Sequence, residues 1–410
     1  MLTGLRSRLQ RLLLFLAILG PGLITASADN DAPGIATYSV AGSTFGYAFL
    51  WILVWITVGE VVVQEMAARM GVATGKGLTD LIRERFGVKL TFFVMLGLIL
   101  ANLGTTAAQF AGVASSAELF GVSRYVAVPI AAAAVWMLVL RGSYRYVERV
   151  LLGLSMYAVA YIASAILVKP DWGEVLHHAI VPTVRLETNY LLAVLATVGT
   201  TITPWAAVYM QATVADKGVR PEDFGYTRAD VVFGAAFGNV VSGFIIIATA
   251  AALFAQGIAV ETAEEAALAL APLAGRWAEV LFGAGLLGAS LLAASVLPLA
   301  TTYAVCEAFG WERGIDHRPE DAPVFYGLYT ALIVLSSLIV LIPGLRLFPL
   351  MWLSQIANAL LLPIILIVML RLANNVRIMR HWRNSRVSNV FVGVLTLLVV
   401  VAAASLLVSS

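Results

Sequence analysis

The chain has 410 residues, of which 60% are apolar and 12% charged, whereas soluble domains carry roughly 25% charged residues, so a water-soluble globule is excluded. The formal net charge of +2 argues against a nucleic-acid partner. One cysteine, Cys306, and four histidines without metal-binding spacing argue against disulfides, zinc sites and thiol catalysis. The sequence therefore predicts an integral membrane protein.

Long apolar runs predict an all-α fold with about eleven transmembrane helices. A helical span needs about 20 apolar residues, whereas membrane β-strands are about 10 residues long and alternate in polarity. These spans leave almost no residues for a soluble domain, so residues 1–410 are expected to form one transmembrane domain. The expected spans are 12–45, 47–70, 90–117, 125–141, 147–168, 190–214, 230–255, 277–305, 325–343, 347–370 and 388–408.

Lysine and arginine set the expected orientation. With a cytoplasmic N-terminus, all but five of the 26 basic residues fall on the cytoplasmic side. Because cytoplasmic loops are enriched in basic residues, we expect the N-terminus inside and the C-terminus outside. The five exceptions are Arg124, Lys169, Arg185, Arg276 and Arg346.

Two of the spans contain helix-breaking sequences. The first span includes Asp-Asn-Asp-Ala-Pro-Gly at residues 29–34, and the sixth includes Thr-Thr-Ile-Thr-Pro at residues 200–204. Breaks in the first and sixth spans are expected if two five-helix repeats, about 12–168 and about 190–370, are inverted copies. The span at about 388–408 is then an extra helix. Interrupted helices at equivalent places indicate a binding site at the membrane midplane.

The broken first span holds the most informative residue, Asp31. A carboxylate near the middle of a membrane costs about 2.5–3.5 kcal/mol, so it needs a partner, a cavity or a cation. Pro33 lacks a donor and Gly34 relaxes the backbone, which frees nearby carbonyl groups. A carboxylate beside free carbonyl oxygens suits a hard cation; the alternative is that Asp31 only caps the following helix. Asp29 and Asn30 are candidate accessory contacts.

The broken sixth span offers hydroxyl groups and a free carbonyl. Thr200 and Thr203 stand beside Pro204, and we expect Thr203 near a hydrated cation, although threonine also bonds to its own helix. No Met, Cys or His lies at this break, so nothing there favours softer transition metals. In the second span, Glu60 falls near the expected midplane, where it is a vestibule charge or a proton acceptor, or pairs with a polar neighbour.

Several motifs together resemble the Nramp family of divalent-metal transporters. They cover the first ten spans and comprise Gly-Pro-Gly at 20–22 with an aspartate at 31, the stretch 64–76 (Gln-Glu-Met-Ala-Ala-Arg-Met-Gly-Val-Ala-Thr-Gly-Lys), Arg-Glu-Arg at 83–85, Gly-Thr-Thr-Ile-Thr-Pro at 199–204 and Ser-Gln-Ile at 354–356. The resemblance implies a leucine-transporter-like fold of five plus five helices, which agrees with the two breaks.

The resemblance also implies a metal site. The family uses an aspartate from an Asp-Pro-Gly-Asn motif, carbonyl groups on both broken helices and a methionine beside the sixth-span proline. Asp31 matches the aspartate, and Ala28 and Thr200 match the carbonyl positions. This chain departs from the pattern because Gly34 stands in place of the asparagine and Thr203 in place of the methionine.

These departures favour magnesium. Loss of the thioether removes the selection for manganese, iron and softer ions over hard alkaline-earth ions. Smaller side chains leave room for the waters that Mg²⁺ is reluctant to shed, and we expect Thr203, Gly34 and Gln355 to shape such a partly hydrated pocket. The chain is similar in this respect to the Nramp-related magnesium transporters. Manganese should still bind because it accepts oxygen ligands.

The family's proton acceptors are also replaced. Its sixth-span histidine aligns with Trp205, and its third-span Asp and Glu align with Thr106 and Gln109. Unless Glu60 substitutes for them, transport is expected to be uncoupled from protons and driven by the metal gradient and the membrane potential.

The resulting hypothesis is a plasma-membrane carrier that imports Mg²⁺, and Mn²⁺ secondarily, by alternating access. Its expected partners are the metal ion and the lipid bilayer, and no resident cofactor is expected. The alternatives are a proton-coupled Mn²⁺ or Fe²⁺ symporter and a sodium-coupled amino-acid symporter. An enzyme is not expected, because the spans contain no nucleophile–base pair and no metal-hydrolase motif.

Overall fold

The computed structural model describes residues 30–141, 158–315 and 317–409, and these ranges contain helices and no β-strand. The α-helices are α3 (Ala32–Phe45), α4 (Leu50–Thr74), α5 (Leu78–Leu119), α6 (Arg124–Arg141), α8 (Ala158–Leu167), α9 (Trp172–Ile180), α10 (Thr188–Thr201), α11 (Pro204–Asp216), α12 (Phe224–Ala252), α13 (Ala263–Ala267), α14 (Ala271–Ala274), α15 (Ala278–Phe309), α16 (Pro323–Val340), α17 (Leu347–Ala373), α18 (Val376–Met379) and α19 (Arg386–Ser409). Single turns of 3-10 helix are η1 (Gly46–Phe49), η3 (Pro221–Asp223), η4 (Phe254–Gln256), η5 (Leu268–Leu270), η6 (Gly275–Trp277) and η7 (Arg380–Trp382).

The membrane character of the helices agrees with the sequence. Within the described ranges, eight helical segments are long and apolar enough to cross a membrane, and every one of the expected spans contains a helix. Large apolar side chains remain exposed on the outer helices, including Phe93 on α5 (67% exposed) and Leu397 on α19 (60% exposed). Apolar surface of this kind is stable against lipid chains and costly against water.

One boundary differs markedly from the sequence prediction. Helix α5 begins at Leu78, well before the expected start at 90. Its first turns carry charged side chains that a search for apolar runs does not detect, and Gly87, with φ 81° and ψ 171°, separates this polar segment from the apolar one. A positive φ is adopted readily by glycine, which has no Cβ.

The predicted sixth-span break is present, and at the first predicted break a helix begins, while residues 12–29 of that span lie outside the described residues. Helix α3 begins at Ala32, directly after Asp31, whose backbone is extended (φ −76°, ψ −178°). In the sixth span, α10 ends at Thr201, Ile202 and Thr203 leave the helical conformation, and α11 begins at Pro204. Proline fits the first turn of a helix because its missing N–H has no intrahelical acceptor there.

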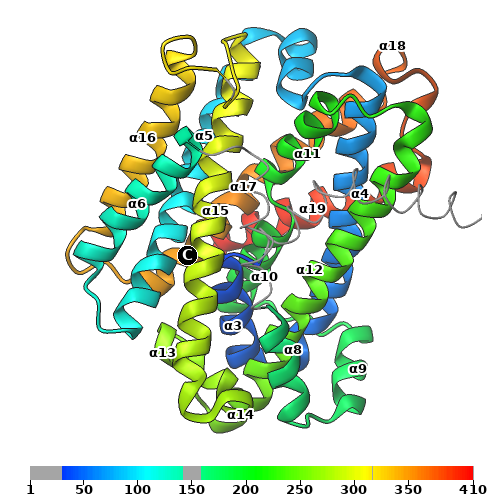
Figure 1. The fold of residues 1–410 in the computed structure, drawn as a ribbon. Coiled ribbons are helices and arrows are strands. Elements are labelled where there is room, and N and C mark those ends of the chain that lie inside the picture. Colours follow the sequence, from blue (N-terminus) through cyan, green and yellow to red (C-terminus); the bar gives the residue numbers. More distant parts are fainter. Residues whose placement is uncertain (1–29, 142–157, 316, 410) are drawn as a thin grey trace, which may run out of the picture.

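The two broken spans lie in the middle of the molecule. Figure 1 shows α3 and α10 between α12 and α15, and both contact α17. Helices α10 and α17 approach closely at Gly199, where a Cβ atom would collide with the backbone carbonyl of Gln355. This glycine therefore lets the two backbones meet just before the sixth-span break. Helices α9, α13 and α14, which the sequence analysis did not predict, lie at the lower end of Figure 1.

Candidate metal centre

Asp31 occupies the N-cap of α3. Its Oδ1 atom accepts a hydrogen bond from the backbone N–H of Gly34 at 2.8 Å, and only 5% of the residue is exposed. Asp31 therefore does cap α3, as the simpler interpretation of this residue predicted. It leaves metal binding open, because an ionised carboxylate has about four lone-pair sites and a cap uses one of them.

The second carboxylate oxygen of Asp31 accepts a hydrogen bond from a residue of α5. The Nε2 atom of Gln109 donates to Oδ2 at 2.5 Å, and the backbone N–H of Ala32 donates to Oε1 of the same glutamine at 3.4 Å. Gln109 is fully buried. The amide thus fixes the carboxylate relative to α5 and supplies a charge-assisted hydrogen bond in a low-dielectric interior.

The sixth-span break presents oxygen atoms with few internal partners. Thr203 is 5% exposed, and its hydroxyl has no hydrogen-bond partner among the described residues. Pro204 lacks an N–H, so the carbonyl of Thr200 loses the donor that a continuous helix would provide. Thr201 behaves differently, because its hydroxyl bonds to the Thr197 carbonyl at 2.8 Å. Internal bonding, the structural alternative for these threonines, therefore applies to Thr201 and not to Thr203.

A polar contact joins α3 to α10, and further polar contacts lie within α17. The hydroxyls of Tyr38 on α3 and Thr201 on α10 lie 2.8 Å apart. On α17, Gln355 donates to Ser354 at 2.8 Å and accepts from Asn358 at 3.1 Å. Gln355 is 1% exposed, so its side chain is enclosed between helices.

A polar row on α5 extends from Gln109. Asn102, Thr105, Thr106 and Gln109 are three and four residues apart, which places them on one helix face. Asn102 donates to Thr301 of α15 at 2.7 Å, and Thr105 accepts from Asn358 of α17 at 3.0 Å. The hydroxyl of Thr106 is buried without a hydrogen-bond partner among the described residues. The four side chains of this row are neutral amides and hydroxyls.

The accessory candidates have separate surroundings. Asn30 donates to the Gly238 carbonyl at 3.1 Å and accepts from Ser242 at 3.0 Å, both on α12. Glu60, which is 1% exposed, accepts from Asn239 of α12 at 2.5 Å. This contact is the polar pairing that the sequence analysis left open for Glu60.

Three further positions complete the set of candidates. Trp205 is buried at the start of α11, with its ring 6.3 Å from that of Tyr209. Gly34 contributes its backbone N–H to the Asp31 cap. Ala28 and Asp29 lie outside the described residues, so their predicted roles stay predictions.

A cavity of about 390 Å³ lies between α3, α10, α17 and the segment before α13. Thr37 and Ala196 line it, one to two helical turns from Asp31 and Thr200. At its other end lie Glu261 and Arg346, which form a 2.6 Å ion pair with both side chains largely exposed. The cavity therefore runs from the surface, on the side predicted to be extracellular, toward the two helix breaks.

A buried carboxylate joins the end of α15 to the start of α5. Near the end of α15, Glu307 is 2% exposed and accepts a hydrogen bond from Thr79 at 2.9 Å. Its carboxylate packs directly against Gly77, where a Cβ atom would collide with it. The sequence analysis missed this contact, although an acidic residue in the last turn of an apolar span is a signal that could have drawn attention to it.

Comparison with known proteins decides the family. The family described as "Nramp: Natural resistance-associated macrophage protein-like" matches residues 22–409. The chain belongs to the Nramp family. The resemblance drawn from the sequence motifs is thereby confirmed. Membership of the magnesium branch stays a prediction.

Individual Nramp relatives and neighbouring folds agree with this assignment. The chain is 30% identical over 400 residues to "Divalent metal cation transporter MntH" of Erwinia tasmaniensis, with 94% of this chain and 92% of the relative covered. The structure of the Eremococcus coleocola manganese transporter matches with a TM-score of 0.76 at 23% identity, covering 96% of this chain and 87% of that one. Mhp1, a nucleobase-cation-symport-1 family transporter, matches with a TM-score of 0.58 at 16% identity, covering 95% and 91%. The predicted leucine-transporter-like fold class is confirmed.

Proposed function

We propose that this Nramp-family chain is a divalent-metal carrier whose preferred cargo is Mg²⁺, with Mn²⁺ as a second cargo, and that it works by alternating access. The observation that carries this proposal is the set of oxygen atoms at the two breaks that could bind a metal ion. It consists of one carboxylate, Asp31, the unpartnered hydroxyl of Thr203 and the carbonyl of Thr200. The chain has no sulfur or imidazole group in the residues of these breaks.

An oxygen-only site with a single carboxylate suits magnesium. Mg²⁺ dehydrates reluctantly, keeps several waters and is usually bound through one or two carboxylates. Soft ligands such as thioethers favour transition metals instead. No cluster of three or more His, Cys, Asp or Glu side chains occurs in the part of the chain that the structure describes. A partly hydrated ion held by Asp31 therefore fits the chemistry better than a fully dehydrated one.

We further propose that transport is not coupled to protons. The side chain of Gln109 replaces a carboxylate and is engaged by Asp31 at 2.5 Å, and Thr106 and Trp205 carry no group that titrates near neutral pH. A divalent ion then enters down its own gradient with the help of the membrane potential, which supplies about 2.3 kcal/mol per charge for each 100 mV.

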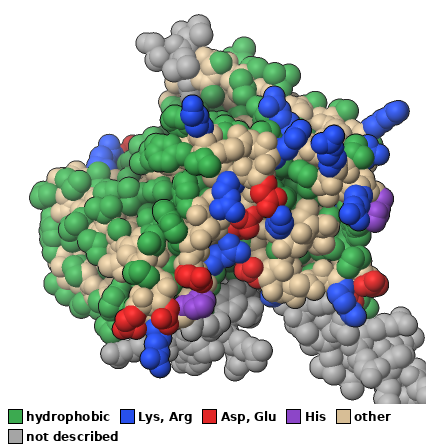
Figure 2. All heavy atoms as spheres, turned by 90° about the horizontal axis from the view of Figure 1, so that it is seen from above, with side chains coloured by type: hydrophobic (Ala, Val, Ile, Leu, Met, Phe, Trp, Pro, Cys, Tyr) green, Lys and Arg blue, Asp and Glu red, His purple; other side chains and the backbone are tan. Residues whose placement is uncertain are grey.

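We also propose a plasma-membrane location with the N-terminus inside and the C-terminus outside. Figure 2 shows Lys and Arg side chains gathered on the face seen from above, which is the end of the molecule that holds α18. An excess of basic residues is typical of the cytoplasmic side. In this orientation the cavity beside Glu261 and Arg346 faces outward, which suits the uptake of an external ion.

Uptake into proteoliposomes tests the cargo and the site together. Purified protein is reconstituted with a magnesium dye inside, and external Mg²⁺ is added under an inside-negative potential. We expect uptake by the wild-type chain and none by Asp31→Asn, because the amide keeps the cap but removes the charge. Asp223→Asn is the matched control, since Asp223 pairs with Arg220 outside the site at 3.1 Å. Normal uptake by a correctly inserted Asp31→Asn variant would contradict the site.

A further inference from the structure

A second pocket, of about 660 Å³, shares no lining residue with the cavity beside the candidate metal site. It is formed by the first turns of α5, the end of α17 and the start of α18, and it is lined by Arg85, Phe86, Arg371, Asn374, Asn375, Val376 and Arg377. Its volume lies within the range of about 300–1,000 Å³ that is typical of ligand pockets. Three of its seven lining residues are arginines, so its chemistry is strongly cationic.

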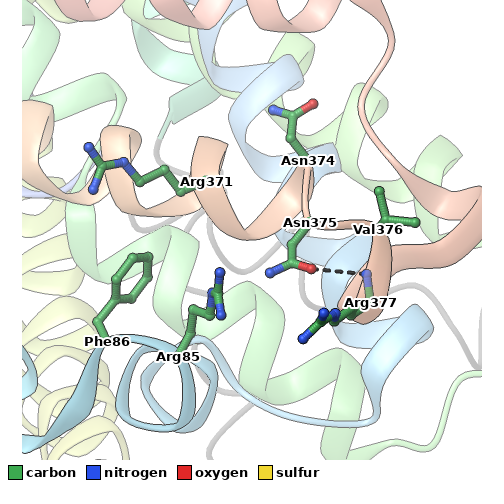
Figure 3. A pocket seen from close by; sticks show the side chains of 7 residues that line it. All are labelled: Arg85, Phe86, Arg371, Asn374, Asn375, Val376 and Arg377. Atoms are coloured by element: carbon green, nitrogen blue, oxygen red, sulfur yellow. Dashed lines mark hydrogen bonds between the residues drawn. The ribbon is translucent and has the colours of Figure 1, made fainter.

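The side chains are arranged around a shared space. In Figure 3 the guanidinium groups of Arg85 and Arg377 and the amide of Asn375 lie near one another, while the Arg371 side chain extends away from them along the edge of the pocket. The side-chain oxygen Oδ1 of Asn375 accepts a hydrogen bond from the backbone N–H of Arg377 at 2.9 Å, which turns the side-chain NH₂ group toward the pocket. The lining therefore offers donors from two helices and the turn between α17 and α18.

The charge of these arginines is not neutralised within the described part of the chain. None of the three guanidinium groups has an ion pair or a hydrogen bond there. The acidic side chains of α5 are engaged elsewhere, because Glu84 pairs with Lys76 at 2.6 Å and Asp80 with Arg83 at 3.4 Å.

The sequence around α18 contains no acidic residue that could neutralise these arginines. No Asp or Glu follows Asp321 in the chain, so the basic segment 371–386 has no acidic residue of its own. Arg85, Arg371 and Arg377 are exposed residues that line one pocket with no acidic partner among the described residues, and an anion in the pocket offsets the repulsion between their like charges. The pocket is therefore built for a negatively charged ligand.

The donors fit a phosphate group. Each guanidinium presents a planar fork of N–H groups that binds phosphate oxygens in pairs, and arginine is favoured over lysine where such pairing matters. A phosphate group has enough oxygens to contact more than one arginine at once. A single carboxylate would satisfy only one fork.

The position of the pocket sets which phosphates can reach it. Arg371 lies in the last turn of the membrane-spanning helix α17, and the apolar side chains of Val88 and Val376 nearby are 63% and 59% exposed. Basic pockets between helices at the cytoplasmic membrane surface bind anionic lipid headgroups. The same pocket is also open to phosphate compounds in the aqueous phase.

We propose that this pocket, defined by Arg85, Arg371 and Arg377, binds a phosphate-bearing anion at the membrane surface. The phosphate lies between the guanidinium groups of Arg85 and Arg377, the Asn375 amide donates a further hydrogen bond, and Arg371 adds positive charge at the edge of the pocket. The site is separate from the metal centre and does not depend on which metal ion the carrier transports.

Binding measurements on the purified protein test this site. The wild-type chain in a zwitterionic detergent is titrated with phosphatidylglycerol, with phosphatidylcholine and with inorganic phosphate, and bound ligand is measured by native mass spectrometry. The pocket variant carries Arg85→Gln, Arg371→Gln and Arg377→Gln together. The control variant carries Arg380→Gln, Arg383→Gln and Arg386→Gln, which removes the same charge from the same basic segment outside the pocket.

We expect the wild type and the control variant to bind the anion and the pocket variant to bind it about 100-fold more weakly. Retention of phosphatidylglycerol that inorganic phosphate does not displace identifies a lipid headgroup as the source. Binding of inorganic phosphate, with displacement of the lipid, identifies a soluble phosphate. If the triple variant does not fold, the single variants Arg85→Gln and Arg377→Gln must each weaken binding. Equal binding by wild-type and pocket variants, or an equal loss in the control, would overturn the proposal.

Discussion

Replacing Gln109 with leucine removes the group that positions the candidate metal ligand while keeping a similar side-chain volume. In the native chain the Gln109 amide donates to Asp31 Oδ2 at 2.5 Å, inside a region where both residues are buried. Leucine cannot donate, so among the described residues the Asp31 carboxylate keeps the hydrogen bond from the N–H of Gly34 and loses the one from Gln109. Without a bound metal ion, the Asp31 carboxylate is then poorly oriented. Part of the free energy of metal binding must be used to fix its orientation.

The size of this effect follows from the hydrogen bond that is lost. A hydrogen bond to a charged group contributes about 1.5–3 kcal/mol, and each 1.4 kcal/mol corresponds to a factor of about ten in affinity. We therefore expect the Mg²⁺ concentration for half-maximal uptake to rise about 10- to 100-fold in Gln109→Leu. The maximal rate should change less, since the leucine leaves the helix packing intact.

Uptake by proteoliposomes over a range of Mg²⁺ concentrations gives both quantities. Gln211→Leu is the matched control, because Gln211 is also fully buried but donates at 3.0 Å to the Lys76 carbonyl, away from Asp31. Its half-maximal concentration should equal that of the wild type. An unchanged half-maximal concentration in a folded Gln109→Leu variant would refute the positioning role of Gln109.

The remaining predictions concern selectivity, coupling and packing. Thr203→Met adds a thioether at the sixth-span break and should shift the preference from Mg²⁺ to Mn²⁺, as competition between the two ions in uptake would show. Glu60→Gln should keep Mg²⁺ uptake, because glutamine still accepts the hydrogen bond from α12; loss of uptake would make Glu60 part of the transport path. Gly199→Ala should destabilise the protein by about 1–3 kcal/mol or more in thermal unfolding, since its Cβ meets the backbone of α17. Gly104→Ala, with open space around it, should not, and equal unfolding temperatures would contradict the close packing.

Much of the fold could be predicted from the sequence because the relevant signals are local. Apolar runs long enough to cross a membrane mark the spans. Pro33 marks the start of α3 to within a residue or two, and Pro204 marks the break in the sixth span. The early start of α5 at Leu78 was missed, because its first turns are charged and belong to a polar helix rather than to a span. Apolar content alone does not detect such a segment.

The site was predicted less completely, because its contacts join residues far apart in the chain. Asp31 and Thr203 could be selected from their own neighbours, a proline and a run of hydroxyl residues. The bond between Gln109 and Asp31 spans 78 positions, whereas the resemblance to the family implied only that Gln109 replaces a proton acceptor. Its place on a polar row of α5 with Asn102 was a signal that it faces other buried polar groups. Which group it contacts follows only from how the helices pack.

The most direct test of the account measures magnesium and protons together. Proteoliposomes that contain both a magnesium dye and a pH dye receive external Mg²⁺ under an inside-negative potential. The account predicts that Mg²⁺ enters while the internal pH stays constant. Manganese entry with internal acidification and no Mg²⁺ flux would contradict it, and the chain would then be a proton-coupled symporter.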